Sequence, residues 1–336
     1  MDILEQILPY SSVSIIGMAK NSGKTVCLNH LLSGLGNTGR KVAVTSVGID
    51  GEKTDLVTQT EKPEIALAEG VFFETSEYHY RQRMLTAEIM EVSGNATSLG
   101  RLVSARTLLS GKVILSGPST SAGVRDFLAK MSDFGANMMI VDGALSRKSH
   151  ASPLLTDGLV LSVGTSLAPD LNTIVRKASE LHNLMQLPDF QASYSTELMQ
   201  EENGVFALGS DTYRDLGIPS SLLSDKYKEK ILSMGTTIFV AGILTDMLLN
   251  FLRTRPEVKD TVVVVKDFTK VFVTPMSLQL YLSKGGRLSV LKRPNLLAVT
   301  VNPVAPSGFR LESALLKESI GKVFGAPVFD VVSDRT

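Results

Sequence analysis

Short apolar runs rich in β-branched residues recur along the first half of the chain, and stretches with helical spacing follow several of them. The runs are at residues 13–16, 41–47, 71–73, 112–116, 138–141 and 159–163, and the helical stretches are at 25–32, 119–134 and 169–185. Uninterrupted apolar strands that alternate with helices are typical of a parallel sheet covered on both faces. The pattern therefore predicts an α/β fold with three layers and a mostly parallel sheet.

The regular pattern weakens near Pro188, where residues 189–204 are polar and only locally periodic. We therefore predict a first domain over residues 1–187 and a C-terminal α/β region over residues 188–336. Strand-like runs resume in that region at 237–241, 261–265, 271–273, 296–301 and 328–332, with a helix at 310–323 between the last two. The pattern leaves open whether this region is a second lobe or continues the first sheet.

Composition and charge describe an ordinary globular chain of 336 residues, with 43 % apolar and 20 % charged residues. The 34 basic residues balance 34 acidic ones. The chain therefore has no global field that attracts a polyanion, and we expect no nucleic-acid partner. Cys27 is the only cysteine, which excludes an intramolecular disulfide. The acidic N-terminus and the lack of a run of about 18 apolar residues favour a cytoplasmic protein that has no membrane segment.

The most specific motif is the segment Gly17-Met18-Ala19-Lys20-Asn21-Ser22-Gly23-Lys24-Thr25, which joins the first predicted strand to the first predicted helix. In this setting loop amides and a helix N-terminus converge on an anion, and a lysine reaches the outer phosphates of a nucleotide. The common phosphate-loop (Walker A) pattern has about four residues between its first glycine and Gly-Lys-Thr. Here five residues separate Gly17 from Gly23, and Met18 stands where glycine is usual. The departure concerns the shape of the loop rather than its chemistry.

The residues of this loop have separate expected roles. Gly23 lets the backbone approach the phosphates, Lys24 places a charge at the β- and γ-phosphates, and the Thr25 hydroxyl binds Mg²⁺. Lys20 is either a second lysine that stabilises charge during phosphoryl transfer or a solvated loop lysine. The residues expected to bind ATP, or GTP, are Gly17, Ala19, Lys20, Asn21, Ser22, Gly23, Lys24, Thr25 and Val26.

A magnesium-dependent nucleotide site also needs carboxylates at the carboxyl ends of strands near the loop. Asp50 follows the predicted strand at 41–47, and Asp142 follows the one at 138–141. We expect Asp142 to hold Mg²⁺ and Asp50 to bind the metal or the attacking water. Lys24, Lys20 and Asp50 form the expected catalytic group, with Glu52 as a reserve base. The alternative for Asp142-Gly143 is a plain turn after a strand.

Other polar residues carry weaker signals. Asn302 follows the predicted strand at 296–301, where it either reads a nucleotide base or caps a turn. His79, His150 and His182 are isolated in the sequence, so we predict no zinc site. The Gly-x-Gly-x-x-Gly pattern is absent after the first strand, which argues against a dinucleotide oxidoreductase.

The order of these motifs resembles the SIMIBI group of phosphate-loop NTPases, which includes dethiobiotin synthetase, the MinD/ParA-type ATPases and the metallochaperone GTPases. Lys24 and Thr25 match that group's loop, Asp50 matches by its position 26 residues after Lys24, and Asp142 matches by its context. The resemblance covers about residues 10–165. It implies a mostly parallel sheet, Mg–NTP on the first loop and, in many members, a homodimer around the nucleotide. The signature lysine of the MinD type would fall at Ala19, so that role does not carry over.

Residues 16–25 and 47–52 also resemble the phosphate-loop subunit of the reactivating system for B12-dependent lysine aminomutase. This resemblance implies an ATP-using, chaperone-like factor whose protein partner is an aminomutase or a second reactivase subunit. The alternatives are a small-molecule kinase or ligase similar to dethiobiotin synthetase, and a regulatory module that binds a nucleotide without hydrolysing it. The expected ligand in each case is a nucleoside triphosphate, with Mg²⁺ as the expected metal.

Overall fold

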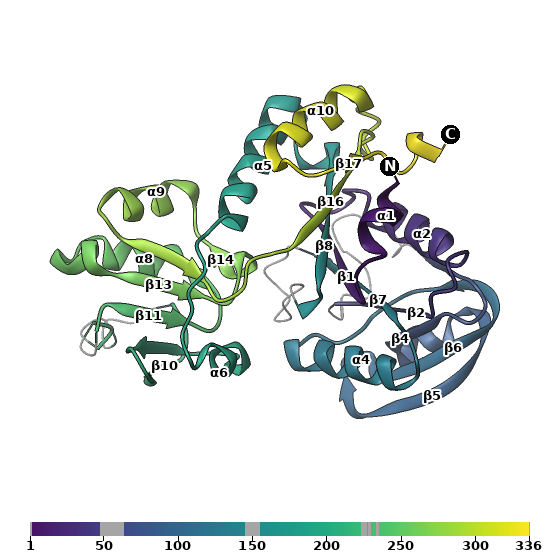
Figure 1. Cartoon of the computed structure of the whole chain (residues 1–336), viewed down its shortest axis with the longest axis horizontal. Coiled ribbons are helices and arrows are strands. Elements are labelled where there is room, and N and C mark those ends of the chain that lie inside the picture. Colours follow the sequence, from purple (N-terminus) through teal and green to yellow (C-terminus); the bar gives the residue numbers. More distant parts are fainter. Residues whose placement is uncertain are drawn as a thin grey trace. The chain divides into compact units, whose positions relative to one another are not determined.

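The computed structural model describes residues 2–47, 64–144, 155–222, 227, 230–232 and 235–335 (Figure 1). The chain divides into two compact units, one of Met1–Ala178 with Asn295–Thr336 and one of Ser179–Pro294. The chain first passes from one unit to the other within α5 (Leu171–Met185). Residues 188–336, grouped as one region from the sequence pattern, are therefore shared between the two units.

The first unit is built on a ten-stranded sheet in which every pairing from β17 to β4 is parallel. The predicted α/β fold with a mostly parallel sheet is confirmed, and the segment after residue 295 adds strands to that same sheet. The strand order is β17 (Val328–Phe329), β16 (Leu296–Asn302), β8 (Gly158–Gly164), β1 (Ser12–Gly17), β7 (Met138–Ala144), β2 (Val42–Ser46), β4 (Phe72–Ser76), β6 (Gly100–Val113) and β3 (Ile65–Leu67), with β5 (Met84–Thr97) paired to β6.

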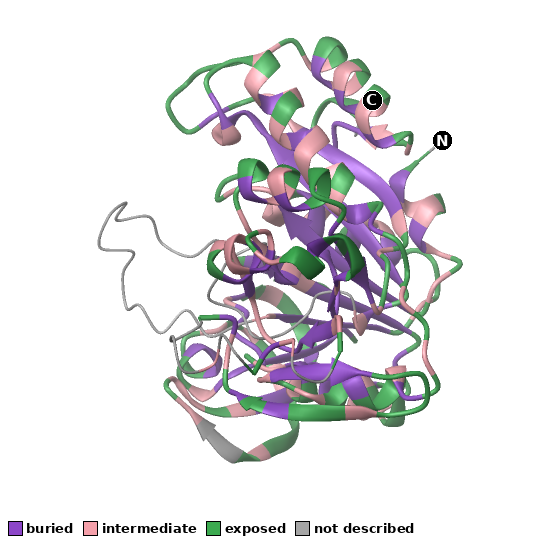
Figure 2. Cartoon of the chain, turned by 90° about the vertical axis from the view of Figure 1, so that its left-hand side faces the viewer, coloured by how far each residue is buried: buried purple, intermediate pink, exposed green. Residues whose placement is uncertain are grey.

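Helices cover both faces of this sheet. Ile140 on β7 packs in one apolar core with Leu28 of α2 (Lys24–Leu35). The next residue, Val141, points to the opposite face and packs in a second core with α4 (Ser121–Asp133). The strands between them are largely buried, whereas the outer faces of the helices are exposed (Figure 2). The arrangement has the three layers that the alternating pattern predicted.

Beyond β4 the sheet becomes antiparallel, and here the structure differs from the sequence prediction. β5 and β6 form a long hairpin, whereas the pattern predicted only a short strand at 112–116, where β6 ends. Ile89 and Met90 on β5 point to opposite faces and are 51 % and 38 % exposed. Because β5 is exposed on both faces, it lacks the one-sided alternation that identifies a half-buried strand. α3 (Glu77–Arg81) connects β4 to this hairpin.

The second unit is a smaller α/β arrangement with its own core. β11, β13 and β15 are parallel, while β9 and β10, which the sequence pattern did not predict, pair antiparallel at one side. The sheet order is β10 (Tyr213–Ile218), β9 (Val205–Leu208), β11 (Thr237–Val240), β13 (Val262–Val265) and β15 (Arg287–Val290). Its other elements are α6 (Ser195–Gln200), α8 (Asp246–Leu252), α9 (Pro275–Ser283), β12 (Leu244–Thr245), β14 (Val271–Phe272) and the 3-10 turns Pro256–Asp260 and Phe268–Lys270.

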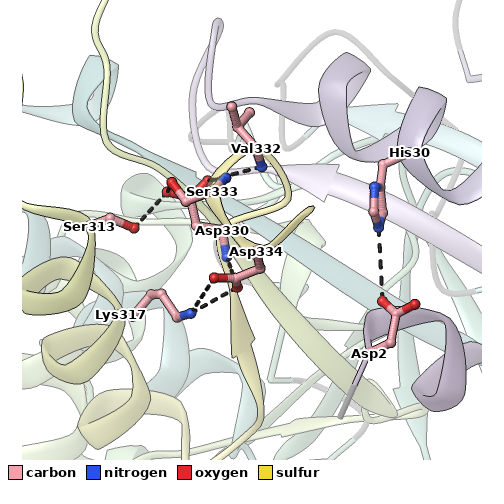
Figure 3. A network of polar contacts seen from close by, with 8 residues as sticks. All are labelled: Asp2, His30, Ser313, Lys317, Asp330, Val332, Ser333 and Asp334. Carbon is pink, nitrogen blue, oxygen red and sulfur yellow. Dashed lines mark hydrogen bonds and ion pairs between the residues drawn. The ribbon is translucent and has the colours of Figure 1, made fainter. Parts of the chain in front are cut away.

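A buried carboxylate ties the last segment of the chain to α10 (Ser313–Phe324). Asp330 is 1 % exposed, and its Oδ2 accepts hydrogen bonds from the hydroxyls of Ser313 (2.6 Å) and Ser333 (2.8 Å). Its Oδ1 accepts from the amides of Val332 and Ser333, as Figure 3 shows. These bonds fold the segment into a turn, so the strand predicted at 328–332 is limited to the two residues of β17.

Two further contacts in Figure 3 lie close to the chain ends. Lys317 of α10 donates to both carboxylate oxygens of Asp334 at 2.8 Å. His30 of α2 lies 3.9 Å from Asp2, which caps α1 (Ile3–Ile7). The contact of Lys317 with Asp334 fastens the last segment of the chain to α10, and the second contact places Asp2 beside α2.

Candidate functional site

The segment 18–23 connects β1, in the interior of the large sheet, to α2. β1 lies between β7 and β8 and runs parallel to both. The segment therefore begins at the edge where the carboxyl ends of these strands meet, which is where open α/β sheets bind ligands. The amide of Met18 donates to the carbonyl of Ser162 on β8 (3.0 Å). The segment is thus tied to a neighbouring strand as soon as β1 ends.

The backbone of this segment turns sharply and packs tightly. Asn21 has φ +61° and Gly23 has φ +96°, both in the left-handed region that glycine adopts without strain. A Cβ at Gly17 would overlap the hydroxyl of Ser22 and lie 2.9 Å from Cδ of Lys24. The Lys24 side chain therefore crosses over the end of β1. A side chain at position 17 would therefore displace the side chains of Ser22 and Lys24, although the spacing of Gly17 departs from the common pattern.

α2 begins without the usual partners for its first amides. Its N-cap is Gly23, which offers no side-chain hydrogen bond, and its first turn contains no acidic residue. α4, in contrast, is capped by the side chain of Thr120. The Ser22 hydroxyl oxygen is buried and has no hydrogen-bond partner in the part of the chain that the structure describes. Orphan amides at the positive end of a helix, beside an unpaired hydroxyl, can receive an anion.

The side chains predicted to contact the nucleotide differ in exposure. Lys24 and Thr25, the first two residues of α2, are partly exposed, and Lys24 forms no hydrogen bond or ion pair with any described residue. Lys20 is exposed, and Val26 is 39 % exposed. The Lys24 ammonium is therefore available to a ligand. Because all nine predicted binding residues belong to this one segment, the fold keeps them together.

Asp142 lies in β7 on the face of the sheet that α2 covers. Side chains alternate along a strand, so Asp142 shares a face with Ile140, which packs against α2. Burial raises the pKa of the Cys27 thiol on α2, a hydrogen bond with Thr300 opposes this, and the Asp142 charge raises the pKa further, to about 12. The structure thus brings Asp142 close to the beginning of the helix that carries Thr25.

Two of the sequence predictions about carboxylates have different outcomes. Asp142 and Gly143 lie inside β7, which continues to Ala144, so the alternative of a plain turn at this position is wrong. Asp50 and Glu52 belong to residues 48–63, outside the described residues, and their expected roles remain predictions.

Residues from β8 and β16 also lie against the loop. A Cβ at Gly164 would lie 2.8 Å from Cα of Ser22. The hydroxyls of Ser162 and Thr300 are 2.8 Å apart, and Asn302 donates from Nδ2 to the carbonyl of Asn21 (3.2 Å). Of these four residues, only Asn302 has a role that the sequence predicted. The one available signal was that each lies at or near the carboxyl end of an apolar run.

A second polar cluster, at the end of β4, contains His79, which appeared isolated in the sequence. The Ser116 hydroxyl lies 2.7 Å from His79 Nδ1 and 2.7 Å from the Ser76 hydroxyl, and all three residues are buried. These bonds attach the segment after β6 to β4 and satisfy polar groups that burial has removed from water. Within the described ranges, no group of three or more His, Cys, Asp and Glu is arranged to hold a metal ion.

Comparison with known proteins gives a distant similarity. The chain is 28 % identical over 188 residues to the UDP-N-acetylmuramoyl-L-alanyl-D-glutamate--2,6-diaminopimelate ligase of Corynebacterium glutamicum. The similar stretch is 55 % of this chain and 33 % of the ligase, so the chain spans about a third of that relative's length. No protein-family model and no solved structure matches the chain. Among the described helices, none has the length and apolar character needed to cross a membrane.

Proposed function

We propose that the chain binds ATP as its Mg²⁺ complex at residues 17–26 and uses it in a phosphoryl-transfer reaction. The observation that carries this proposal is the beginning of α2. Its helix end has no side-chain cap, the buried Ser22 hydroxyl has no partner among the described residues, and Lys24 has no counter-ion among them. Together these groups suit the charge and the acceptor oxygens of a triphosphate.

The residues available for a metal fit Mg²⁺. Thr25 offers a hydroxyl and Asp142 a carboxylate on the α2 face of the sheet, and Mg²⁺ prefers such hard oxygen ligands. The ion, when bound, neutralises charge that develops on the phosphates. We propose Thr25, Asp142 and Asp50 as the residues that hold it, directly or through water. Lys24 and Lys20 then stabilise the transferred group, and Asp50 orients the attacking water or acceptor.

The similarity to a ligase favours an enzyme over a regulatory module that only binds a nucleotide. We therefore propose a kinase-type or ligase-type reaction in which a small acid accepts the phosphoryl group. The second candidate is the ATP-using factor that reactivates a B12-dependent aminomutase. That candidate depends on the resemblance of residues 16–25 and 47–52, and the similarity to the ligase does not add to it.

Calorimetric titration of the purified chain with Mg–ATP and Mg–GTP tests the binding step. We expect Lys24→Ala to weaken Mg–ATP binding by about 100-fold, because a charge-assisted contact to phosphate contributes about 1.5–3 kcal/mol. The matched control is Lys322→Ala, since Lys322 is a surface lysine paired with Glu318 on α10. Wild-type affinity in Lys24→Ala would show that the phosphates bind elsewhere.

Phosphate release separates the two candidate roles. An ATP-dependent kinase or ligase turns over only with an acceptor acid, whereas a reactivating factor hydrolyses ATP faster when its partner protein is added. Lys20→Ala should lower the rate of turnover while leaving the affinity for Mg–ATP near that of the wild type. An equal loss of affinity would assign Lys20 to binding rather than to catalysis.

A further inference from the structure

Asn302, the last residue of β16, contacts the loop at residues 21–23 from the side of the sheet. Its Nδ2 donates to the carbonyl of Asn21 (3.2 Å), and a Cβ at Gly23 would lie 3.0 Å from Cβ of Asn302. Its Oδ1 accepts from the amide of Val304 (3.2 Å), and its carbonyl accepts from the Thr165 hydroxyl (3.3 Å). Val304 thus holds the side chain of Asn302 and Thr165 holds its backbone, beside the loop.

The hydrogen bond to Asn21 determines the direction of the next amide. The carbonyl of Asn21 and the N–H of Ser22 belong to one planar trans peptide unit, so they point in opposite directions. A carbonyl held toward β16 therefore directs the Ser22 N–H away from β16. This peptide follows the only non-glycine residue with positive φ in the described chain. Asn adopts this left-handed conformation more readily than most residues, but the conformation still costs free energy that surrounding contacts must offset.

We propose that Asn302 is a positioning residue of the nucleotide loop, which holds the Asn21–Ser22 peptide so that the amides after it face the phosphates. The inference depends on the proposed function, because it assigns Asn302 a part in the binding of the triphosphate. The Oδ1 contact with Val304 favours the turn cap over the reading of a base, because the amide group of Asn302 already contacts the protein at Asn21.

Two ligands distinguish the positioning role from the reading of a base. Mg–ATP carries the base and the phosphates, whereas inorganic tripolyphosphate with Mg²⁺ carries the phosphates alone. We expect Asn302→Ala and the isosteric Asn302→Leu to bind both ligands about tenfold more weakly. This is the effect expected when about one hydrogen bond to a loop that binds a charged ligand is lost. Calorimetry measures both affinities, and a thermal melt of each variant shows whether it is folded.

The matched control is Asn295→Ala, just before the other end of β16. Asn295 donates from Nδ2 to the carbonyl of Asp157 (3.0 Å), so this variant loses the same kind of bond away from the loop and should bind both ligands as the wild type does. Unchanged binding of both ligands by folded Asn302 variants would overturn the inference. Weaker Mg–ATP binding with unchanged tripolyphosphate binding would also overturn it, in favour of base reading. A wild type that binds neither ligand would instead overturn the proposed function, and this inference with it.

Discussion

The backbone of Ser22 lies directly against Gly164 at the end of β8, because a Cβ on Gly164 would be 2.8 Å from the Cα of Ser22. Ser22 is itself 1 % exposed, and a Cβ at the neighbouring Gly17 would overlap the Ser22 hydroxyl. The loop is therefore held between two glycines on adjacent strands. Its shape depends on the close approach of the Ser22 backbone to Gly164 and of the Ser22 and Lys24 side chains to Gly17, and glycine permits such approaches because it has no Cβ.

Gly164→Ala should disturb the loop without unfolding the sheet. The added methyl group meets backbone rather than the end of a flexible side chain, so the loop has to move. Overpacking of this kind costs about 1–3 kcal/mol, and we expect the affinity for Mg–ATP to fall by about tenfold or more. Calorimetric titration measures the change.

The control for this variant is Gly158→Ala, at the opposite end of the same strand. A methyl group there meets the side chain of Leu297, so the variant should lower the melting temperature without changing the affinity for Mg–ATP. If Gly164→Ala binds Mg–ATP as tightly as the wild type, the packed form of the loop is not the form that binds the nucleotide.

Asp142→Asn should remove the contribution of Mg²⁺ to nucleotide binding. The variant keeps the size of the side chain but loses the charge that a divalent ion needs. We expect ATP affinity without Mg²⁺ to stay near the wild-type value and the affinity for Mg–ATP to fall by about tenfold. Titrations with ATP in the presence of Mg²⁺ or of a chelator measure both values.

Asp157→Asn is the matched control for the proposed metal site, since Asp157 lies just before β8, at the end of the strands opposite to the loop. Its Oδ2 accepts hydrogen bonds from Ser11 and Ser12, so the variant should lose stability but keep its Mg²⁺ dependence. An unchanged response of Asp142→Asn to Mg²⁺ would remove this carboxylate from the metal site.

Cys27 should be unreactive in the folded protein. The thiol is buried, its pKa is raised to about 12 by burial and by the Asp142 charge against the effect of Thr300, and only the thiolate is a strong nucleophile. At pH 8 we expect no modification by a thiol reagent such as iodoacetamide in the native state. In urea we expect one modified thiol per chain, because Cys27 is the only cysteine. Stoichiometric labelling of the native protein would contradict the position of Cys27 against the sheet.

The Asp330 carboxylate should stabilise the fold in a pH-dependent way. Burial raises the pKa of Asp330, but hydrogen bonds from Ser313, Ser333 and the Val332 amide lower it by more, so its pKa lies below the ordinary 3.8. A carboxyl group with a lowered pKa stabilises the folded state above its unfolded pKa, and this contribution is lost as the pH falls through the folded pKa. Asp330→Asn should therefore cost about 2 kcal/mol at pH 7.

Urea unfolding at several pH values between 7 and 3 measures this contribution. The difference in the free energy of unfolding between the wild type and Asp330→Asn should shrink as the pH falls towards 3. Glu318→Gln is the control, because Glu318 forms an exposed pair with Lys322 on the same helix and exposed pairs contribute little. A difference that stays constant down to pH 3 would mean that the charge of Asp330 is not the stabilising feature.

Part of the fold could be predicted because the signals that encode it are local. The apolar run at 13–16, the glycine-rich segment and the helical spacing at 25–32 are contiguous, so the strand, the loop and the helix follow from neighbouring residues. The long β5–β6 hairpin was missed because its strands carry no such local signal. Exposure on both faces of β5 removes the periodic pattern from which a strand is recognised.

The sequence by itself determined that a glycine-containing loop near residue 17 joins a strand of a parallel α/β sheet to a helix, with Lys24 and Thr25 at the start of that helix. Only the tertiary structure decided which strands surround that loop. β16 pairs with β8 across about 140 residues of sequence, after the chain has formed a separate unit over Ser179–Pro294. Gly164 and Asn302 therefore meet the loop through sheet pairing. A periodic pattern records which face of a strand is buried, but it does not record the neighbour beside which that strand lies.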